Sequence, residues 1–435
     1  MIRALVFLLL LPVLGRTQAL ASAPWATYKR VYDRLFPQIE RIRIFDNHAH
    51  PGYADDPNVD AMASPPGSTP LRLRADNPEL VAAAKALFDY PYADFAPEHA
   101  KWLVAKKQAS RKTGQAYFDG ILDRLGIEAS AANRVDMPGY LDPKRFRWVC
   151  FADSFLFPLD NRAIAARNRD ERVYIPLQEK LFKSELKAAG LSALPDSLDG
   201  YISFVDRTLS ENQRKGAIGI KFEAAYFRSL HFGDPSKADA EAVYSKYRAG
   251  GVPSFEDYTL FQDYVFRRIL DEASRLHLPV QFHTSVGIGD YFSFHNGSVL
   301  NLENILRDPR YDGVTFVLLH GGYPFDRAAI WLTMRQNVYI DTSLMELWLY
   351  PHEFARVLRE WLEILPDKMV YGSDAFPFND AVGAEESYWL AVKSAREALA
   401  TALAEMVACK EITEDEALHL ARNYLHDTAV KLYKR

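Results

Sequence analysis

The sequence predicts a (β/α)8 barrel, a TIM barrel of the α/β class, with helical insertions and C-terminal helices. Short apolar runs typical of buried parallel strands alternate with helical patterns along most of the 435 residues. Imidazole or carboxylate side chains stand at the ends of several runs, where the sites of such barrels lie. An open doubly wound sheet fits the alternation too, but it would not gather side chains from separated strands around one point.

Eight strands are expected from apolar runs bounded by turn-forming residues or by helical patterns. In chain order these runs are 42–50, 129–135, 146–155, 217–222, 279–283, 314–320, 338–342 and 369–371. Helices are expected where apolar residues recur at three- and four-residue spacing. These segments are 25–40, 78–88, 99–113, 116–125, 254–276, 302–306, 328–336, 354–364, 385–406 and 414–433.

Two stretches exceed what a minimal barrel requires. Residues 51–75 are rich in Pro, Gly, Ser and Asp and predict a long loop, and residues 160–213 are mostly helical. Residues 22–435 are therefore expected to form a single barrel domain with insertions at about 51–115 and 158–214. A hydrophobic content of 49% is ample for one large core.

The net charge limits the kinds of partner that the protein is expected to bind. The formal net charge is -5, and basic residues are spread along the chain rather than gathered in blocks. Both features argue against nucleic acid and anionic membrane surfaces as main partners. A small-molecule substrate is expected instead, and a homo-oligomer is left open.

Residues 1–21 have the composition of a signal peptide. Arg3 precedes an apolar stretch from Ala4 to Gly15, and Ala19-Leu20-Ala21 offers a cleavage site of small residues. The stretch is short for a membrane span, which needs about 20 residues. An uncleaved anchor and a buried first helix are the alternatives. We expect export to the periplasm or the medium, without membrane contact after cleavage.

Export would permit a disulfide between the two cysteines, Cys150 and Cys409. Each lies in an apolar or helical run, where an isolated cysteine usually behaves as a small hydrophobe. A bridge between them therefore remains an alternative to two free thiols.

The candidate functional residues are His48, His50, His283, His320 and Asp374, each at the end of an apolar run. The two histidines of the first run are two residues apart, so on a strand they project to the same face. Neutral imidazoles and a carboxylate from separate strand ends form a nitrogen- and oxygen-rich metal site. Such a site with an open position for water predicts metal-dependent hydrolysis.

Four motifs carry a resemblance to the amidohydrolase superfamily, specifically its amidohydrolase-related branch. They are Phe45-Asp-Asn-His48-Ala-His50-Pro, Gln281-Phe-His283-Thr, Leu318-Leu-His320-Gly-Gly-Tyr-Pro and Tyr371-Gly-Ser-Asp374, in the order of strands one, five, six and eight. The segment Gly219-Ile-Lys221-Phe-Glu-Ala-Ala-Tyr226-Phe-Arg228 also resembles the amidohydrolase-like half of proteins fused to a glutamine synthetase domain.

The resemblance implies a divalent cation, best matched by zinc, held by His48, His50, His283 and Asp374. One ion is expected, and two remain an alternative. Asp374 would also accept the proton of the attacking water. His320 would polarise or protonate the substrate beside one ion, or bind the second of two.

Lys221 has several interpretations. In family members with two metals a lysine of strand four is carboxylated and bridges them, whereas an unmodified Lys221 could face an anionic substrate or pair with Glu223. Arg228 could assist by binding a substrate carboxylate with two hydrogen bonds. Tyr226, on the loop after the same strand, is expected to line the pocket.

We therefore expect a metal-dependent hydrolase of a small anionic amide, lactone or ester. The branch also contains non-oxidative decarboxylases, which are the first alternative. A non-catalytic ligand-binding barrel is the second, although such a barrel would have no need of Asp374.

Overall fold

The eight strands form one parallel sheet in which each strand pairs with the next in chain order. The computed structural model describes residues 14–60, 70–379 and 382–433. Backbone hydrogen bonds from Asn47 N to Tyr371 O and from His50 N to Ala375 O join the first strand to the end of the last. The sheet is thus a nearly closed barrel, as predicted. The strands are β1 (Ile44–Ala49), β2 (Ile127–Arg134), β3 (Phe146–Phe151), β4 (Gly219–Phe222), β5 (Val280–Phe282), β6 (Phe316–Leu318), β7 (Val338–Asp341) and β8 (Met369–Val370).

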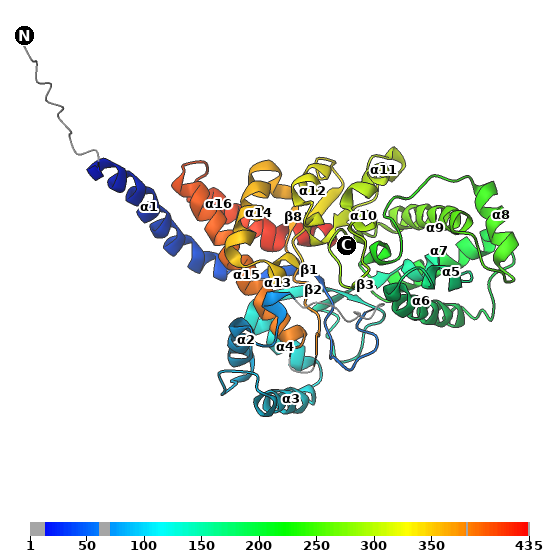
Figure 1. Cartoon of the computed structure of the whole chain (residues 1–435), viewed down its shortest axis with the longest axis horizontal. Helices are drawn as coiled ribbons and strands as arrows, with labels where there is room; N and C mark the ends of the chain where they lie inside the picture. Colours follow the sequence, from blue (N-terminus) through cyan, green and yellow to red (C-terminus); the bar gives the residue numbers. More distant parts are fainter. Residues whose placement is uncertain (1–13, 61–69, 380–381, 434–435) are drawn as a thin grey trace, which may run out of the picture.

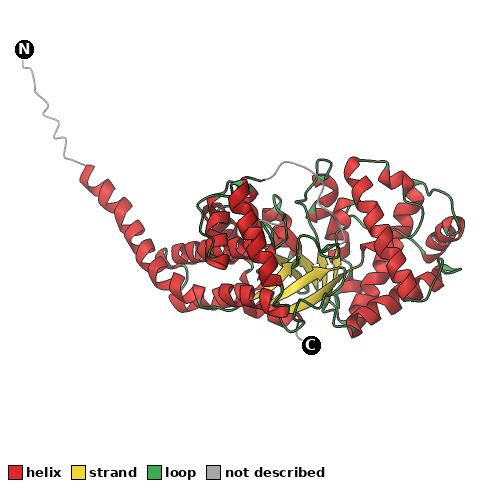
Figure 2. Cartoon of the chain, turned by 90° about the horizontal axis from the view of Figure 1, so that it is seen from below, coloured by secondary structure: helices red, strands yellow, loops and turns green. Residues whose placement is uncertain are grey.

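Helices surround the strands, which lie at the centre of the molecule (Figure 2). The helices of the described residues are α1 (Leu14–Glu40), α2 (Pro78–Phe88), α3 (Pro97–Arg111), α4 (Gln115–Leu125), α5 (Arg162–Ala165), α6 (Arg169–Ala188), α7 (Leu198–Arg214), α8 (Lys237–Tyr247), α9 (Phe255–Leu276), α10 (Phe294–Gly297), α11 (Glu303–Leu306), α12 (Asp326–Leu332), α13 (Met345–Trp348), α14 (Pro351–Ile364), α15 (Ala384–Ala408), α16 (Glu414–Arg422) and α17 (Thr428–Tyr433).

Two connections carry extra helices. The connection from β1 to β2 holds α2 and α3 ahead of α4, and the connection from β3 to β4 holds α5, α6 and α7. The latter three gather with α8 and α9 at one flank of the molecule, whereas α2, α3 and α4 form a separate group (Figure 1). Of these helices, α2 and α3 lie within residues 51–115 and α5, α6 and α7 within residues 158–214, the two segments expected as insertions.

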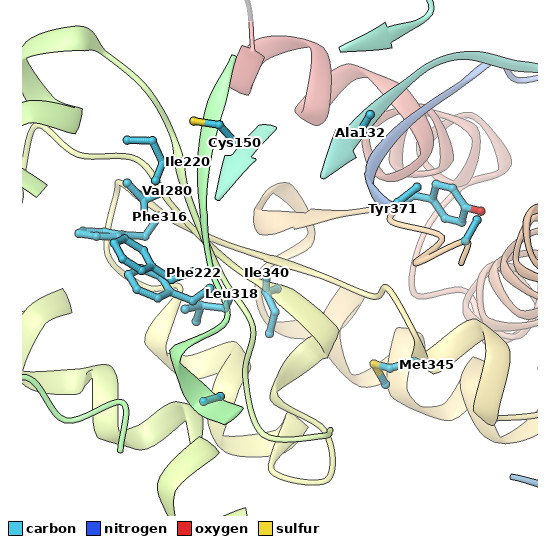
Figure 3. Close-up of a cluster of buried hydrophobic side chains, with 14 of the residues drawn as sticks. Ala132, Cys150, Ile220, Phe222, Val280, Phe316, Leu318, Ile340, Met345 and Tyr371 are labelled. Atoms are coloured by element: carbon cyan, nitrogen blue, oxygen red, sulfur yellow. The ribbon is translucent and has the colours of Figure 1, made fainter. Parts of the chain in front are cut away.

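Outward-facing strand residues make the contact between barrel and helices. Ile220, Val280 and Phe316 stand at one level of three adjacent strands and are fully buried (Figure 3). Cys150 belongs to the same hydrophobic cluster, and its thiol is free, as is that of the exposed Cys409. Cys150 therefore acts as a small hydrophobe, and the alternative of a disulfide is not observed.

The inside of the barrel has its own apolar cluster, which includes Phe45, Val149 and Val317. The ring of Tyr433, from α17, stacks on Phe45 with ring centroids 5.8 Å apart. The Tyr433 hydroxyl donates a hydrogen bond to Asn47 Oδ1 at 2.7 Å. The C-terminal helix thus packs into the barrel core, whereas the sequence pattern predicts only that residues 414–433 are helical.

Helix α1 begins within the predicted signal peptide and projects from the body (Figure 1). Its C-terminal half packs against α15 and buries Val31, Leu35 and Ile39. Most of the predicted signal peptide, residues 1–13, lies outside the described residues. Among the helices that the structure describes, none is both long and apolar enough to cross a membrane.

Candidate metal centre

The five candidate residues meet at the mouth of the barrel, at the carboxyl ends of their strands. His48 lies in β1, His50 and His283 directly follow β1 and β5, and His320 and Asp374 lie in the turns after β6 and β8. The backbone of His320 (φ 63°) and of Asp374 (φ 50°) is left-handed. Non-glycine residues adopt this conformation at a cost, and functional sites are where it concentrates.

A group that could hold a metal ion consists of His48, His320 and Asp374, whose potential ligand atoms lie within 4.8 Å of one another. Asp374 Oδ1 lies 3.0 Å from His48 Nε2 and 3.5 Å from His50 Nε2. The rings of the two β1 histidines are 4.9 Å apart and nearly perpendicular. Their two Nε2 atoms thus converge on one carboxylate oxygen, as the two-residue spacing predicted.

His283 reaches this group through His320, whose Nε2 lies 2.9 Å from His283 Nδ1. His283 Nε2 lies 2.5 Å from the carbonyl oxygen of Val286, so Nε2 carries the proton and donates it. The lone pair of His283 is then on Nδ1, the nitrogen that faces His320. His320 therefore belongs to the group formed with His48 and Asp374, whereas His283 contacts that group through His320.

All four imidazoles are held neutral. Burial lowers the pKa of His48, His50 and His320 well below the ordinary value, and it lowers that of His283 to about 3. The positive charge of Lys221 acts in the same direction on all four. Neutral rings offer lone pairs, which metal ligation requires.

Lys221 is fully buried on β4, with Nζ 3.5 Å from His48 Nε2 and 3.9 Å from Glu223 Oε1. It therefore lies beside the histidine group and next to an acid, and it is absent from the described residues that line the cavity. This position fits the pairing with Glu223 better than a direct contact with a substrate.

Arg228 is not brought to the site, and its expected role as a substrate anchor is wrong. Its guanidinium pairs with Asp263 at 2.6 Å and donates to Gln262 Oε1 and to the carbonyl oxygens of Ser229 and His231. These partners, two of them on α9, use its donors within a buried structural network. The two partners on α9 could not be assigned to Arg228 from sequence, because they depend on how α9 packs.

A cavity of about 50 Å³ opens at the histidine group. Tyr226 lines it as predicted, with its ring centroid 4.6 Å from that of His283. The described lining residues are His50, Asp60, Tyr174, Glu223, Tyr226, His283, Ile288, His320, Leu344, Asp374, Phe376 and Phe378. The walls are thus aromatic or aliphatic, and the polar groups face the strand ends.

Two acidic residues that line this cavity are not predicted as site residues by the sequence. Asp60 Oδ2 lies 3.1 Å from His50 Nδ1, and Asp60, Glu223 and His50 form a second group with ligand atoms within 4.8 Å. Glu223 follows Lys221 at a two-residue spacing, which could have placed it on the same face. Asp60 comes from the long loop, where the sequence carries no periodic signal.

Further buried acids hold the ligand residues in place. Asp46 accepts hydrogen bonds from the hydroxyls of Ser130 and Ser373, both at 2.8 Å. Asp341 accepts from the backbone N–H of His320 at 2.8 Å and from Asn47 Nδ2 at 2.9 Å. These carboxylates hold the strand ends in place, and they thereby fix the orientation of the imidazoles.

The residues present fit a divalent cation. Neutral imidazoles and a carboxylate are the donor set that zinc and similar ions take in proteins. His48 Nε2 and His50 Nε2 both face Asp374 Oδ1, at 3.0 and 3.5 Å. The group is therefore suited to bind a metal ion through nitrogen.

Comparison with known proteins agrees with this geometry. A family model described as "Amidohydrolase" matches residues 205–435. Protein fluG of Emericella nidulans is 26% identical over 230 residues, which are 50% of this chain and 25% of that protein. The chain thus spans about a quarter of the length of this curated relative.

Solved structures share the fold at low identity. A protein from Lactobacillus casei described as a metal-dependent hydrolase has a TM-score of 0.57 at 17% identity and covers 92% of this chain and 97% of its own. Uronate isomerase from Thermotoga maritima has a TM-score of 0.59 at 12% identity, covering 93% and 97%. Glucuronate isomerase from Caulobacter crescentus scores 0.57 at 14% identity, covering 95% and 94%.

Proposed function

Because this chain belongs to the amidohydrolase family, we propose that it is a metal-dependent hydrolase that cleaves the amide, ester or lactone bond of a small molecule. The observation that supports the proposal most is the convergence of His48, His320 and Asp374 within 4.8 Å at the barrel mouth. A divalent cation there, zinc in this proposal, would supply a Lewis acid and acidify water. His48, His50 and Asp374 would hold it, with His283 and His320 as further nitrogen donors.

Asp374 is the proposed general base. Its side chain is 13% exposed and lines the cavity, whereas the side chain of His48 beside it is completely buried. Its carboxylate can therefore reach a water molecule in the cavity and accept the proton as the water attacks the carbonyl carbon. General-base catalysis of this kind contributes roughly 10²–10⁴-fold in rate.

His320 is proposed to bind the cation through Nε2. Its ring lines the same cavity, and Ser343 Oγ lies 2.9 Å from its Nδ1. Ser343 Oγ also donates to Asp341 Oδ1 at 2.8 Å, so toward His320 it accepts, and Nδ1 carries the ring proton. The ring is neutral because burial keeps its pKa low, and it therefore presents the lone pair of Nε2 to the site.

The expected preference for an anionic substrate is not retained. It depended on Lys221 and Arg228 as anchors, but Arg228 pairs with Asp263, and neither residue is among the described residues that line the cavity. Lys221 is proposed to act unmodified, as the cation that keeps the neighbouring imidazoles neutral. The choice between substrate classes therefore depends on the residues that line the cavity.

Metal analysis of dialysed protein tests the site. We expect about one equivalent of metal in the wild type and loss of it in the double variant His48→Ala with His50→Ala, which removes two of the few protein ligands. The matched control replaces two exposed histidines, His352→Ala with His419→Ala, and should keep the metal. Stoichiometric metal in the first double variant would refute the assignment.

Product analysis tests the reaction. The metal-loaded protein would be screened against N-acyl amino acids, lactones and aromatic carboxylates. Hydrolysis adds one water to the substrate mass, decarboxylation releases carbon dioxide, and isomerisation leaves the mass unchanged. The last two outcomes would replace the proposed reaction while keeping the metal site.

Two proposals rest on sequence alone. Residues 1–21 are proposed to be a signal peptide, with the mature protein in the periplasm or the medium. Residues 22–435 are proposed to act as one catalytic domain on a small-molecule substrate.

A further inference from the structure

We propose that Tyr174 of α6 and Tyr226 of η3 (Ala224–Tyr226) are positioning residues of the metal site, because together they hold the loop that orients His283. This loop, residues 284–293, connects the end of β5 to α10. The inference rests on the proposed function, in which His283 is a nitrogen donor to the metal ion. It goes further by assigning a role to α6, which belongs to the insertion between β3 and β4.

The direction of the His283 lone pair depends on this loop. Nε2 of His283 lies 2.5 Å from the carbonyl oxygen of Val286. A carbonyl oxygen only accepts hydrogen bonds, so Nε2 carries the proton and Nδ1 keeps the lone pair that a metal ion requires. Displacement of Val286 would release the ring to turn or to change tautomer. The position of one loop carbonyl therefore sets how well His283 can bind the ion.

The loop is anchored on the near side of Val286 by Ser285. Ser285 has a left-handed backbone (φ 60°), and its N–H donates to the carbonyl oxygen of Gly297 at 2.5 Å. Its hydroxyl oxygen accepts from the N–H of Val299 at 3.2 Å. Residues 286–292 then form neither helix nor strand. Contacts from outside the loop must therefore hold the far side of Val286.

Two tyrosine hydroxyls supply such contacts at Ile288. The hydroxyl oxygen of Tyr226 accepts from the N–H of Ile288 at 3.4 Å, and the hydroxyl of Tyr174 donates to the carbonyl oxygen of Ile288 at 3.2 Å. Both backbone polar groups of this residue are thus bound, from two different elements. The two rings line the cavity with centroids 5.4 Å apart. The loop is consequently fixed two residues beyond the carbonyl that orients His283.

Helix α6 contacts the loop at a second point, Tyr291. The buried carboxylate of Asp170, in the first turn of α6, accepts from the N–H of Tyr291 at 2.8 Å. The guanidinium of Arg169 lies 4.7 Å from the centroid of the Tyr291 ring. The contacts of α6 with Ile288 and Tyr291 join residues 114 and 121 positions apart in the chain. The insertion therefore holds the far side of the loop.

The test removes the two hydroxyls and keeps the rings. Tyr174→Phe with Tyr226→Phe loses both hydrogen bonds to Ile288. The zinc affinity of this double variant and of the wild type is measured by competition with a chromophoric chelator. We expect affinity about 10-fold weaker in the variant, at the lower end of the roughly 10–100-fold loss that follows when the partners of ligand histidines are changed.

The matched control is Tyr201→Phe with Tyr244→Phe. These tyrosines are also buried, their ring centroids lie 5.5 Å apart, and their hydroxyls donate to the carbonyl oxygens of Phe155 and Pro195. Neither is among the described residues that line the cavity. The control should lower the midpoint of denaturant unfolding at least as much as the test variant does, and it should leave zinc affinity unchanged.

Nitrogen NMR of the zinc-loaded protein, labelled at histidine, gives a second readout that a loss of stability alone would not change. We expect the wild type to carry the proton of His283 on Nε2 and to protect it from exchange with water. The variant Tyr174→Phe with Tyr226→Phe should exchange this proton faster, because Val286 is no longer held. A wild type with the proton on Nδ1 would overturn the inference.

Unchanged zinc affinity in the test variant would also overturn it, and so would an equal loss of affinity in the control. If either double variant does not fold, Tyr174→Phe and Tyr244→Phe alone decide by the same comparison. A wild type that binds zinc, with no difference between the two variants, refutes only the inference. A wild type that binds no metal ion refutes the proposed function, and the inference with it.

Discussion

Asp374→Asn separates a catalytic from a structural role for the residue on which the enzyme mechanism depends. Asp374 Oδ1 lies 3.0 Å from His48 Nε2, and the residue has a left-handed backbone (φ 50°). Asparagine tolerates that conformation as well as aspartate does, so the fold should be kept. It retains an oxygen for weak ligation, but it cannot accept a proton from water.

The expected loss is about 10²–10⁴-fold in kcat, the usual contribution of a general base. At about 1.36 kcal/mol for each factor of ten, this is roughly 3–5 kcal/mol of barrier. A purely structural role predicts a much smaller effect. The next helix, α15, begins at Ala384, so Asp374 caps no helix whose loss could be confused with catalysis.

The assay is initial-rate kinetics on the best substrate of the screen, with metal content and thermal unfolding measured on the same samples. The control is Asp367→Asn, an exposed aspartate just before β8, at the opposite end of the strand. It should change activity little, since surface substitutions rarely exceed about 0.5 kcal/mol in stability. Near wild-type turnover of metal-loaded Asp374→Asn would show that catalysis does not pass through this residue.

Two further predictions concern particular side chains, and a third concerns the predicted signal peptide. Arg228→Met should destabilise the fold by about 3–5 kcal/mol, because it leaves the buried Asp263 unpaired; lost substrate binding with unchanged unfolding in denaturant would instead restore its role as an anchor. Burial raises the pKa of Glu185 from 4.5 to about 8, so the folded state retains a proton that the unfolded state loses, and stability falls as pH rises through that window. Glu185→Gln should remove this fall, leaving the variant about 1–2 kcal/mol more stable than the wild type at pH 9, as measured by denaturant midpoints. Cleavage after Ala21 should appear in the intact mass of exported protein, and a mass that includes residues 1–21 would contradict processing.

The strand and helix order could be predicted because its signals are local. The bounds of α2, Pro78–Phe88, agree with the prediction, since Asn77 caps the helix and proline stands at its first position. Most strands are shorter than their apolar runs: β5 covers only Val280–Phe282 of the expected 279–283, whereas β2 (Ile127–Arg134) begins two residues before the expected 129–135. At the end of a run the residues no longer pair with the neighbouring strand, because the chain turns there and directs a side chain into the barrel mouth.

The histidines and Asp374 were predictable for the same reason. A two-residue spacing fixes the common face of His48 and His50 whatever surrounds them. The parallel order of the strands then brings His283, His320 and Asp374 to the same end of the barrel. Sequence therefore determined the barrel, the family and the members of the histidine group.

Only the tertiary structure determines which other charged residues lie beside the histidine group. Arg228 lies two residues beyond η3 (Ala224–Tyr226), yet it pairs with Asp263 on α9, and the long loop carries Asp60 to His50. Both outcomes depend on contacts between residues more than nine positions apart in the chain, and no periodic pattern encodes them. A strand end fixes the direction of its own side chains, whereas the partner of a long charged side chain depends on which distant element packs nearest to it.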